Sequence, residues 1–395
     1  MSAAIRRLSR PEFIALIAAN MALTAFSIDS MLPALPEIAQ ALTPDAPNRA
    51  QLVLTSFVFG MGLGTLFTGP LSDSFGRKPV MFGGAILYVI GALLAAHAQS
   101  LDTMLASRVV QGIGMAGPRV VTLAIVRDQY EGRTMAAIMS YALMIFTLVP
   151  AVAPLLGSYI IAGFGWRAVF YSFIVFAFLA IGWLMVRQAE TLPKEARRPF
   201  NPSALVTATK ECFGYKVFTL STFLQILSFG MLFGCLSSVQ QIFETSFDRA
   251  ASFPYWFALI ALVAGSASVL NARLVVRVGM QRMIAAGFGM QIFFSVAVVL
   301  AGLSTSVPFP LYVIWTTSLF FMAGLVIGNL NALAMEPVGH IAGLAASVLG
   351  AVATVLGAAI AAPIGLAFDG TPLPLAIATT ILSTLGYAIV KRGLR

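Results

Sequence analysis

Asp29 is the residue with the clearest potential for chemistry, because of where it lies. Of the 15 acidic residues it is the only one well inside a long apolar segment, and Pro33 follows about one turn later. A carboxylate in such surroundings must face water, lie beside a basic group or hold a proton. Its affinity for a proton would therefore change as its surroundings change. The alternative is a structural Asp that forms hydrogen bonds before a kink at Pro33.

Arg108 and Arg119 are basic residues of a second apolar segment. Arg108, followed by Gln111 on nearly the same face, could be the counter-charge of Asp29, or it could bond backbone carbonyls around the first segment. Arg119 follows about three helical turns after Arg108 and so lies on the same face. Either its side chain reaches the membrane surface, or it adds a second positive charge to an internal cavity. A charge in the cavity would favour anionic or zwitterionic ligands.

The segment "GPLSDSFGRK", from Gly69 to Lys78, is the most specific local pattern. Glycines permit close packing and a tight turn, Asp73 can pair with a basic group or a helix N-terminus, and basic residues anchor a loop at a membrane surface. A generic basic loop is the alternative. Together with the end of the apolar segment that contains Arg108, this loop is expected to act as a latch that stabilises one conformation of the protein. The predicted latch comprises Gly69, Asp73, Gly76, Arg77, Lys78, Arg127 and Asp128.

A third pattern, "PAVAPLLG", contains Pro150, Pro154 and Gly157. Proline frees a backbone carbonyl and bends a helix. Gly157 would allow close contact with a helix of the other half of the molecule. The alternative is a kinked helix with a packing role only.

The composition shows which elements must position these residues. The chain has 59% hydrophobic and 10% charged residues, with a mean hydropathy of +0.92. Soluble globular chains are roughly 45–50% apolar and about 25% charged, so this is an integral membrane protein. A bilayer core needs about 20 apolar residues per helix. An all-α fold is predicted, with 12 transmembrane helices at about 12–36, 52–72, 80–98, 103–126, 135–162, 168–186, 217–243, 255–276, 284–303, 311–334, 341–366 and 374–390.

The basic residues indicate the orientation. With the N-terminus inside, only Arg49, Arg167 and Arg249 fall on the outer side, which places both termini in the cytoplasm. The net charge of +9 therefore reflects topology, not a nucleic-acid partner. The longest polar stretch divides the apolar segments six and six, and a weak echo of the "GPLSDSFGRK" loop in the second half suggests pseudo-symmetry. The predicted domains are an N-terminal six-helix bundle at 1–186, a cytoplasmic linker at 187–216 and a C-terminal six-helix bundle at 217–395.

Several motifs carry a resemblance to a known family. "GPLSDSFGRK" resembles the signature loop of the major facilitator superfamily, and "LASRVVQGIG" resembles its motif in the fourth span. "DSMLPALPEIA", "PAVAPLLG", "GWRAVF" and "PVGHIAGLAAS" are similar to the Bcr/CflA branch of drug:proton antiporters. The resemblance covers roughly Asp29 to Ser347 and implies the major facilitator fold. It also implies that the Asp matching Asp29 carries the coupled proton. Arg119 departs from the family, which is usually small and apolar there.

The substrate cavity is expected to be a largely apolar box with few polar contacts. Aromatic side chains would supply most of its walls. The predicted lining residues are Phe26, Gln111, Arg119, Tyr141, Phe146, Gln225, Phe229, Phe233, Trp256 and Asn329.

The sequence contains no nucleotide-binding loop, metal-ligand cluster or nucleophile elbow, so it predicts neither ATP hydrolysis nor an enzyme. No metal and no cofactor are expected; a proton gradient would supply the energy. The expected function is proton-coupled export of small amphipathic compounds or antibiotics across the bacterial inner membrane, by a monomer whose partners are substrate, protons and lipid. Metabolite uptake or exchange on the same fold, and a non-transporting membrane sensor, are the alternatives.

Overall fold

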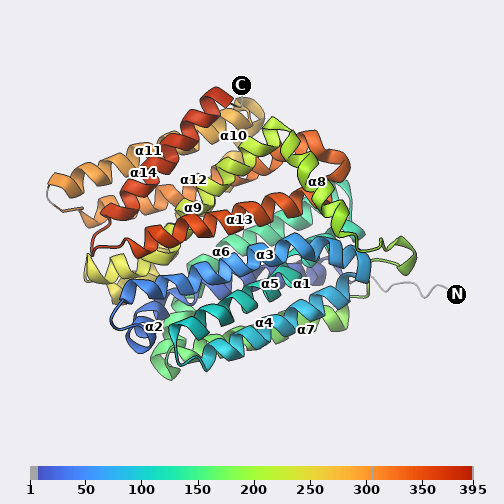
Figure 1. Cartoon of the computed structure of the whole chain (residues 1–395), viewed down its shortest axis with the longest axis horizontal. Coiled ribbons are helices and arrows are strands. Elements are labelled where there is room, and N and C mark those ends of the chain that lie inside the picture. Colours follow the sequence, from blue (N-terminus) through green and yellow to red (C-terminus); the bar gives the residue numbers. More distant parts are fainter. Residues whose placement is uncertain (1–7, 305, 394–395) are drawn as a thin grey trace.

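The structure is a computed structural model that describes residues 8–304 and 306–393, except for the side chains at 133, 136, 140, 143 and 145–147. Long helices lie side by side, and every regular element in the described residues is helical (Figure 1). The predicted all-α class is therefore confirmed.

The first half of the chain forms six membrane-spanning segments. Its first span is interrupted after Asp29, where a 3₁₀ turn at Leu32–Ala34 contains Pro33. Proline has no backbone N–H to continue the helical ladder, which explains the break. The helices are α1 (Arg10–Asp29), α2 (Leu35–Leu42), α3 (Leu52–Phe75), preceded by a 3₁₀ turn at Pro47–Gln51, α4 (Arg77–Ala96), α5 (Leu101–Gln129), α6 (Gly132–Phe164) and α7 (Arg167–Arg187).

The linker and the second half follow. The linker contains a helix that the sequence analysis did not predict, α8 (Pro202–Gly214), which is capped by Asn201 and packs on α9 and α13. Short 3₁₀ turns lie at Lys194–Ala196, Ala250–Ser252 and Glu336–Ile341. The spans are α9 (Lys216–Thr245), α10 (Phe253–Val278), α11 (Met280–Ser304), α12 (Phe309–Met335), α13 (Ala342–Leu366) and α14 (Leu373–Gly393).

Twelve spans are present in the described part of the chain, as predicted. Ten stretches are long and apolar enough to cross a membrane, and one of them, Phe309–Leu366, contains both α12 and α13. The apolar part of α6, Leu148–Phe164, supplies the remaining span.

Glycines set the close approach of α5 to its neighbours. A Cβ at Gly112 would overlap the carbonyl oxygen of Phe57, and a Cβ at Gly60 would overlap that of Val109. On the other side of α5, a Cβ at Gly114 would overlap the backbone of Tyr88 in α4. Small residues of this kind let membrane helices pack backbone against backbone. The helix that carries both Arg108 and Arg119 is therefore held firmly between α3 and α4.

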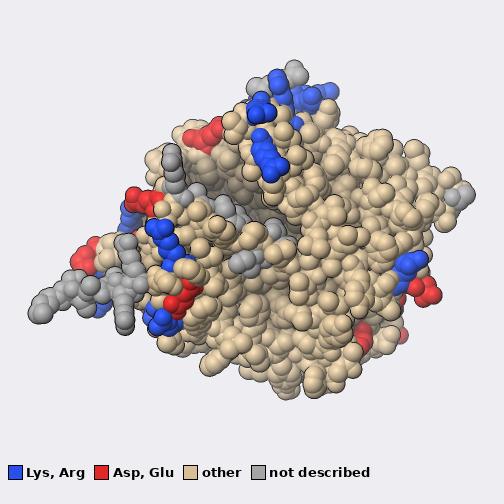
Figure 2. Space-filling model, turned by 180° about the vertical axis from the view of Figure 1, so that it is seen from behind, with Lys and Arg blue, Asp and Glu red and all other residues tan. Residues whose placement is uncertain are grey.

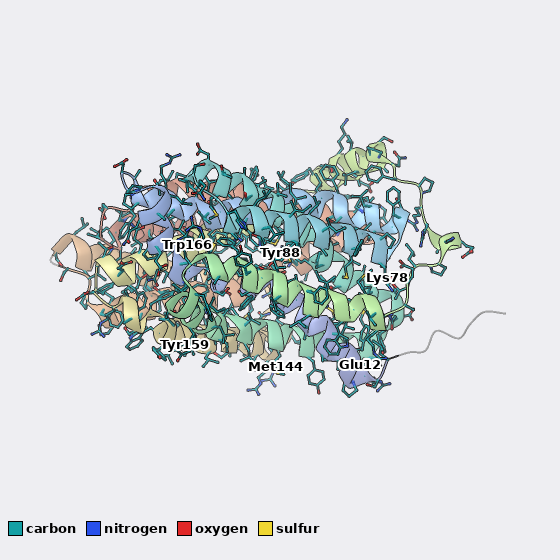
Figure 3. The ribbon with its side chains drawn as sticks, turned by 90° about the horizontal axis from the view of Figure 1, so that it is seen from below. Glu12, Lys78, Tyr88, Met144, Tyr159 and Trp166 are labelled. Atoms are coloured by element: carbon teal, nitrogen blue, oxygen red, sulfur yellow. The ribbon has the colours of Figure 1, made fainter. Side chains whose placement is uncertain are left out.

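The two halves meet along two helix pairs, α3 with α13 and α6 with α10. Glu12 and Lys78 lie toward one end of the bundle, Trp166 lies toward the other, and Tyr88 lies between them (Figure 3). We call the end that carries Glu12 and Lys78 the linker end, because Arg187, where the linker begins, bonds Glu12 there through Nε and Nη2 at 2.7 and 3.0 Å. The opposite end is the far end.

Charged side chains gather near the two chain termini and in a smaller group on the opposite side, and the broad surface between is almost free of charge (Figure 2). Large apolar side chains cover this middle surface; Phe178 and Val276, for example, are 77% and 88% exposed. Such a belt is expected where lipid is the solvent.

Candidate functional site

Asp29 is the last residue of α1, and its side chain is buried. It is only 4% exposed, and it forms no hydrogen bond or ion pair with any residue that the structure describes. A buried carboxylate without a partner is costly in its charged form. The helix is interrupted near Pro33, and the Asp29 side chain has no partner among the described residues. Together these two features make Asp29 the strongest candidate for a group that takes up and releases a proton.

Arg108 does not pair with Asp29. Its guanidinium donates to the carbonyl oxygens of Val53 at 3.2 Å and Ser27 at 3.2 Å, and to Oε1 of Gln111 at 2.6 Å. It also lies over the ring of Phe57, 4.3 Å from the centroid. The structure therefore does not contain the ion pair between Arg108 and Asp29. It shows the alternative, in which a fully buried Arg108 bonds backbone carbonyls around the first span.

Ser27 links Arg108 to a third helix. The Ser27 hydroxyl bonds the Tyr88 hydroxyl at 2.6 Å, and Ser27 is two residues before Asp29. We call Ser27, Tyr88, Arg108 and Gln111 the buried polar cluster. It joins α1, α4 and α5 just beside the end of α1, so it fixes where Asp29 lies. Tyr88 and Ser27 were not predicted, because a lone Tyr or Ser in an apolar segment gives no signal of such a role.

Gly157 allows α6 to press against the break in the first span. A Cβ at this position would overlap the carbonyl oxygen of Ser30, directly after Asp29. The partner of Gly157 is therefore α1 of its own half, not a helix of the other half as predicted. Pro150 and Pro154 lie inside the same helix, whose bounds are continuous from Gly132 to Phe164.

Gly157→Ala is expected to lower the free energy of unfolding by about 1–3 kcal/mol, because the added methyl group meets backbone that cannot rotate away. Gly163→Ala is a matched control on the same helix, since no atom lies within 4 Å of a Cβ there. The midpoint of thermal unfolding in lipid nanodiscs measures both. Equal midpoints for the two variants would contradict the proposed contact.

Three members of the predicted latch, Asp73, Arg77 and Asp128, form one hydrogen-bonded group at the linker end. Arg77 donates from Nε and Nη2 to the two carboxylate oxygens of Asp128 at 2.9 and 3.1 Å, and from Nη1 to Asp73 at 2.5 Å and to Ser72 at 2.8 Å. Bidentate Arg–carboxylate pairs of this kind are strong and directional. They tie the start of α4 to the ends of α3 and α5.

The linker completes the latch, which the sequence analysis missed. Both carboxylate oxygens of Glu190 accept from the first backbone N–H groups of α4, those of Arg77 and Lys78, at 3.0 Å each. A carboxylate is favourable at a helix N-terminus. The Thr191 hydroxyl bonds Asp128 at 2.6 Å. Gly76 turns the chain here with a φ of +102°, a conformation that suits glycine.

Asp128→Asn is expected to destabilise the fold by about 2–3 kcal/mol, because its side chain is only 17% exposed and accepts three charged or hydroxyl hydrogen bonds. Asp73→Asn should cost about 1 kcal/mol or less, because that side chain is 52% exposed. Thermal unfolding of the two variants under the same conditions tests the difference. A larger loss for Asp73→Asn would show that the latch is assigned to the wrong carboxylate.

Lys78, Gly69 and Arg127 complete the predicted set. Lys78 donates to the carbonyl oxygen of Met185 at 2.8 Å. A Cβ at Gly69 would come within 2.7 Å of Oγ of Ser347, so this glycine marks close approach of α3 and α13 across the two halves. Arg127 lines the cavity described next and forms no hydrogen bond or ion pair with the described residues.

A central cavity of about 490 Å³ lies between the halves. Both α5 and α12 line it, together with parts of α3, α9 and α13. It reaches the surface at the linker end, where the exposed residues Asp73 and Arg127 line it. The molecular surface is also hollowed between the charged groups near the termini (Figure 2). This volume suits a drug-sized ligand.

Three of the predicted cavity residues line this cavity: Arg119, Gln225 and Phe229. Phe229 stacks on Phe233 with 5.2 Å between ring centroids, and Phe233 itself does not line the cavity. Gln225 forms no hydrogen bond with the described residues, and its Oε1 is buried.

Arg119 does not reach for the membrane surface. It lies ten residues, or about 15 Å, before the end of α5 at Gln129. Its Nη1 donates to Sδ of Met61, 3.4 Å away, and Met61 lies about 21 Å before the linker end of α3. Helical side chains lean toward the N-terminus of their helix, which for α5 is the far end. The guanidinium therefore points toward the interior of the protein. This geometry supports the interpretation in which Arg119 adds a positive charge to the cavity.

The remaining predicted lining residues lie elsewhere. Phe26 packs edge-on against Phe173 and Phe176 inside the first half, and Gln111 is fully buried in the polar cluster. Tyr141 is 52% exposed and does not line the central cavity. The side chain of Phe146 lies outside the described residues.

Two residues of the second half are also corrected. Asn329 donates to Asn271 and to the carbonyl oxygen of Leu325, both at 2.7 Å, so it joins α12 to α10. Its neighbour Asn331 lines the cavity instead. Trp256 packs edge-on against Phe309 at 5.0 Å, in an aromatic group near the far end. A hydrophobic segment that is apolar all round does not show which side faces inward.

Polar contacts join the halves at the far end. Gln51 bonds Gln241 at 2.5 Å and Ser238 at 3.0 Å, and Asn48 bonds Gln241 at 2.8 Å. Asn48 also donates to the carbonyl oxygen of Phe368 at 2.7 Å. We call Asn48, Gln51, Ser238 and Gln241 the far gate. With these bonds in place and the central cavity open at the linker end, the protein has the geometry of one state of an alternating-access cycle.

Comparison with protein families gives one match over most of the chain, the Major Facilitator Superfamily, over residues 17–362. The bicyclomycin resistance protein homolog of Haemophilus influenzae is 31% identical over 378 residues, 92% of each chain. The multidrug resistance protein MdtL of Klebsiella pneumoniae subsp. pneumoniae is 28% identical over 383 residues, 92% of this chain and 91% of that one. These relatives confirm the resemblance that the motifs indicate.

Solved structures share the fold at low identity. The xylose transporter XylE from E. coli, in a partially occluded inward-open conformation, has a TM-score of 0.75 and 14% identity, with 98% of each chain covered. A peptide transporter POT in complex with sulfate has a TM-score of 0.77 and 12% identity, covering 97% of this chain and 95% of that one.

Proposed function

The chain belongs to the major facilitator superfamily, and we propose that it is a proton-coupled transporter that exports small amphipathic compounds, antibiotics among them, from the cell. It is a multi-pass membrane protein and a transporter, not an enzyme. The observation that carries the proposal is the buried carboxylate of Asp29, which has no partner among the described residues, in a molecule whose central cavity is open at one end and closed by the far gate at the other. The names of the relatives, bicyclomycin and multidrug resistance proteins, support export of antibiotics.

In the proposed cycle, Asp29 gains a proton from outside as substrate leaves, and gives it up to the cytoplasm after the halves rock. The moving bodies are the six-helix units at 1–186 and 217–395, joined by the linker at 187–216. The latch would hold the first unit together at the cytoplasmic side, and opening of the far gate would admit the outside solution. No cofactor takes part in this cycle, and its energy comes from the proton gradient.

The proposed location is the bacterial inner membrane, with the linker end and both termini in the cytoplasm. The excess of Lys and Arg in loops of the linker end supports this orientation. The proposed partners are the small-molecule substrate, protons and lipid, and the proposed unit is the monomer.

Proton movement coupled to substrate tests the function. Proteoliposomes with an imposed proton gradient and an internal pH dye are challenged with an amphenicol, bicyclomycin and ethidium in turn. Antiport predicts that at least one compound drives protons out of the compartment it enters, and that the compound accumulates in energised everted vesicles. Accumulation in right-side-out vesicles instead would favour uptake. No proton movement and no accumulation with any compound would favour a sensor.

A further inference from the structure

We propose that the central cavity selects amphipathic organic anions, and that Arg119 and the Gln225 amide bind the anionic group. The proposal rests on the proposed function, because it names the substrate class of the same cavity. It departs from a cavity built for cations, in which acidic side chains would face the ligand.

Arg119 is a cation without an anion. Among the described residues its only polar contact is the thioether of Met61 at 3.4 Å, a weak acceptor. A guanidinium offers five N–H donors, so most of its donors remain available. At about 15 Å from the end of α5 it also lies beyond the reach of solvent-exposed acids at the mouth. Charges this deep in a membrane protein are usually paired or serve a ligand.

The acids of the cavity are already engaged. Asp73 and Asp128 line its mouth, and both are bonded by Arg77. The lining residues include three Arg and two Asp, which leaves a net charge of +1. That excess lies with Arg119 and Arg127, neither of which has an acidic partner in the described residues. Asp29 does not line the cavity, so it does not contact a ligand bound there.

The opposite wall supplies a second polar group. Gln225 of α9 lines the cavity, is 3% exposed and forms no hydrogen bond within the described residues. A buried amide that no protein group satisfies is costly unless water or a ligand bonds it. The buried atom without a partner is Oε1, an acceptor, which water or a donor group of the ligand would have to bond. The NH₂ group is the part of the amide that can donate to a carboxylate, sulfonate or phosphate. Arg119 and Gln225 belong to different halves, so a ligand that bonds both would bridge the two bodies that the proposed cycle moves.

The rest of the wall fits an apolar body. Phe229, Leu349 and Ile327 also line the cavity. With about 490 Å³ available, the cavity suits a ring system with one acidic group better than an inorganic ion. A low-dielectric cavity also strengthens the attraction between a ligand anion and a fixed cation.

The test compares two dyes that share a xanthene skeleton. Fluorescein carries a carboxylate and is negatively charged at neutral pH, whereas rhodamine 123 is a methyl ester with a positive charge. Binding of each dye is measured by fluorescence anisotropy with the full-length protein in nanodiscs, and empty nanodiscs give the blank. The variants are Arg119→Gln, Arg119→Lys and Gln225→Leu. Arg392→Gln, an exposed residue of α14, makes the same charge change outside the cavity.

Fluorescein should bind wild type more tightly than rhodamine 123. Arg119→Gln should weaken fluorescein binding about 10- to 100-fold, as loss of a charge-assisted hydrogen bond predicts, and Gln225→Leu should weaken it less. Arg119→Lys should retain part of the affinity, and Arg392→Gln should match wild type. Unchanged fluorescein binding in Arg119→Gln, or tighter binding of rhodamine 123 to wild type, would overturn the proposal. If Arg119→Gln fails to fold, the proposal is still tested by the dye preference of wild type and by the fluorescein affinity of Arg119→Lys.

The two proposals fail in different ways. Anion binding that depends on Arg119, without proton movement in proteoliposomes, would retain the anion site and remove the antiport function. Proton movement with rhodamine 123 or ethidium, and none with fluorescein, would retain antiport and remove the anion site.

Discussion

Asp29→Asn is expected to abolish substrate-driven proton movement and to leave the protein folded. The carboxylate has no hydrogen-bond or ion-pair partner among the described residues, so its replacement by an isosteric amide breaks no contact that the structure shows. The amide also removes the cost of a buried charge. What the variant loses is the ability to bind and release a proton at the end of α1. Substrate-induced pH change in proteoliposomes measures the loss, and thermal unfolding measures the fold.

Asp102→Asn provides the control for Asp29→Asn. Asp102 is 88% exposed at the far end, where it lies 3.6 Å from Arg49, and its replacement should leave both proton movement and stability as in wild type. Exchange of substrate down its own gradient should persist in Asp29→Asn, because the cavity itself is untouched. Proton movement that survives in Asp29→Asn would take the coupling role away from this residue.

Arg108→Lys is expected to cause a large loss of stability, of the order of 3–5 kcal/mol. The guanidinium satisfies the carbonyl oxygens of Val53 and Ser27 and the side chain of Gln111 at once, and all three acceptors are buried. A Lys ammonium is a single point charge that cannot span acceptors on three helices in the same fork. It would also lose the stacked contact with Phe57. The fall in the midpoint of thermal unfolding in nanodiscs checks this prediction.

Arg187→Lys is the matched control for Arg108→Lys. Arg187 also makes two hydrogen bonds through its guanidinium, to Glu12, but its side chain is 53% exposed and the pair is screened by solvent, so Arg187→Lys should unfold at nearly the same temperature as wild type. If Arg108→Lys unfolds at the same temperature as wild type and loses only proton coupling, then Arg108 acts on Asp29 directly and its structural role is wrong.

Asp29→Asn and Arg108→Lys distinguish a residue needed for proton coupling from a residue needed for the stability of the fold. Asp29→Asn should lose function at constant stability, whereas Arg108→Lys should lose stability first and function as a consequence. Ser27 explains the connection: its carbonyl accepts from Arg108, its hydroxyl bonds Tyr88, and it lies two residues before Asp29. The buried polar cluster thus fixes the end of α1, which carries the titrating group.

The sequence was sufficient wherever a property is local. Hydrophobicity over about 20 residues identifies a membrane span without knowledge of its neighbours, so the twelve spans were predictable. The break after Asp29 follows from Pro33, which lacks a backbone donor. Part of the latch was also predictable, because Asp73 and Arg77 are about one helical turn apart and Gly76 signals the turn between α3 and α4.

The structure of the linker could be predicted from the sequence only in part. Glu190 could be noted as an acid in a basic stretch, but its position over the first N–H groups of α4 depends on how the linker folds back. The helix α8 was not predicted within the polar segment, although Asn201 followed by Pro202 is a typical start of a helix.

By itself, the sequence determined the number of spans, the membrane environment and the isolation of Asp29 as the one acid deep in an apolar segment. Only the tertiary structure decided which side chains face the cavity. Membrane helices are apolar on every side, so nothing in the sequence distinguishes Phe229, which lines the cavity, from Phe26, which packs inside its own half. The partner of Arg108 was also a tertiary result, because every residue carries a backbone carbonyl and only the packing of α1, α3 and α5 shows which ones an Arg can reach.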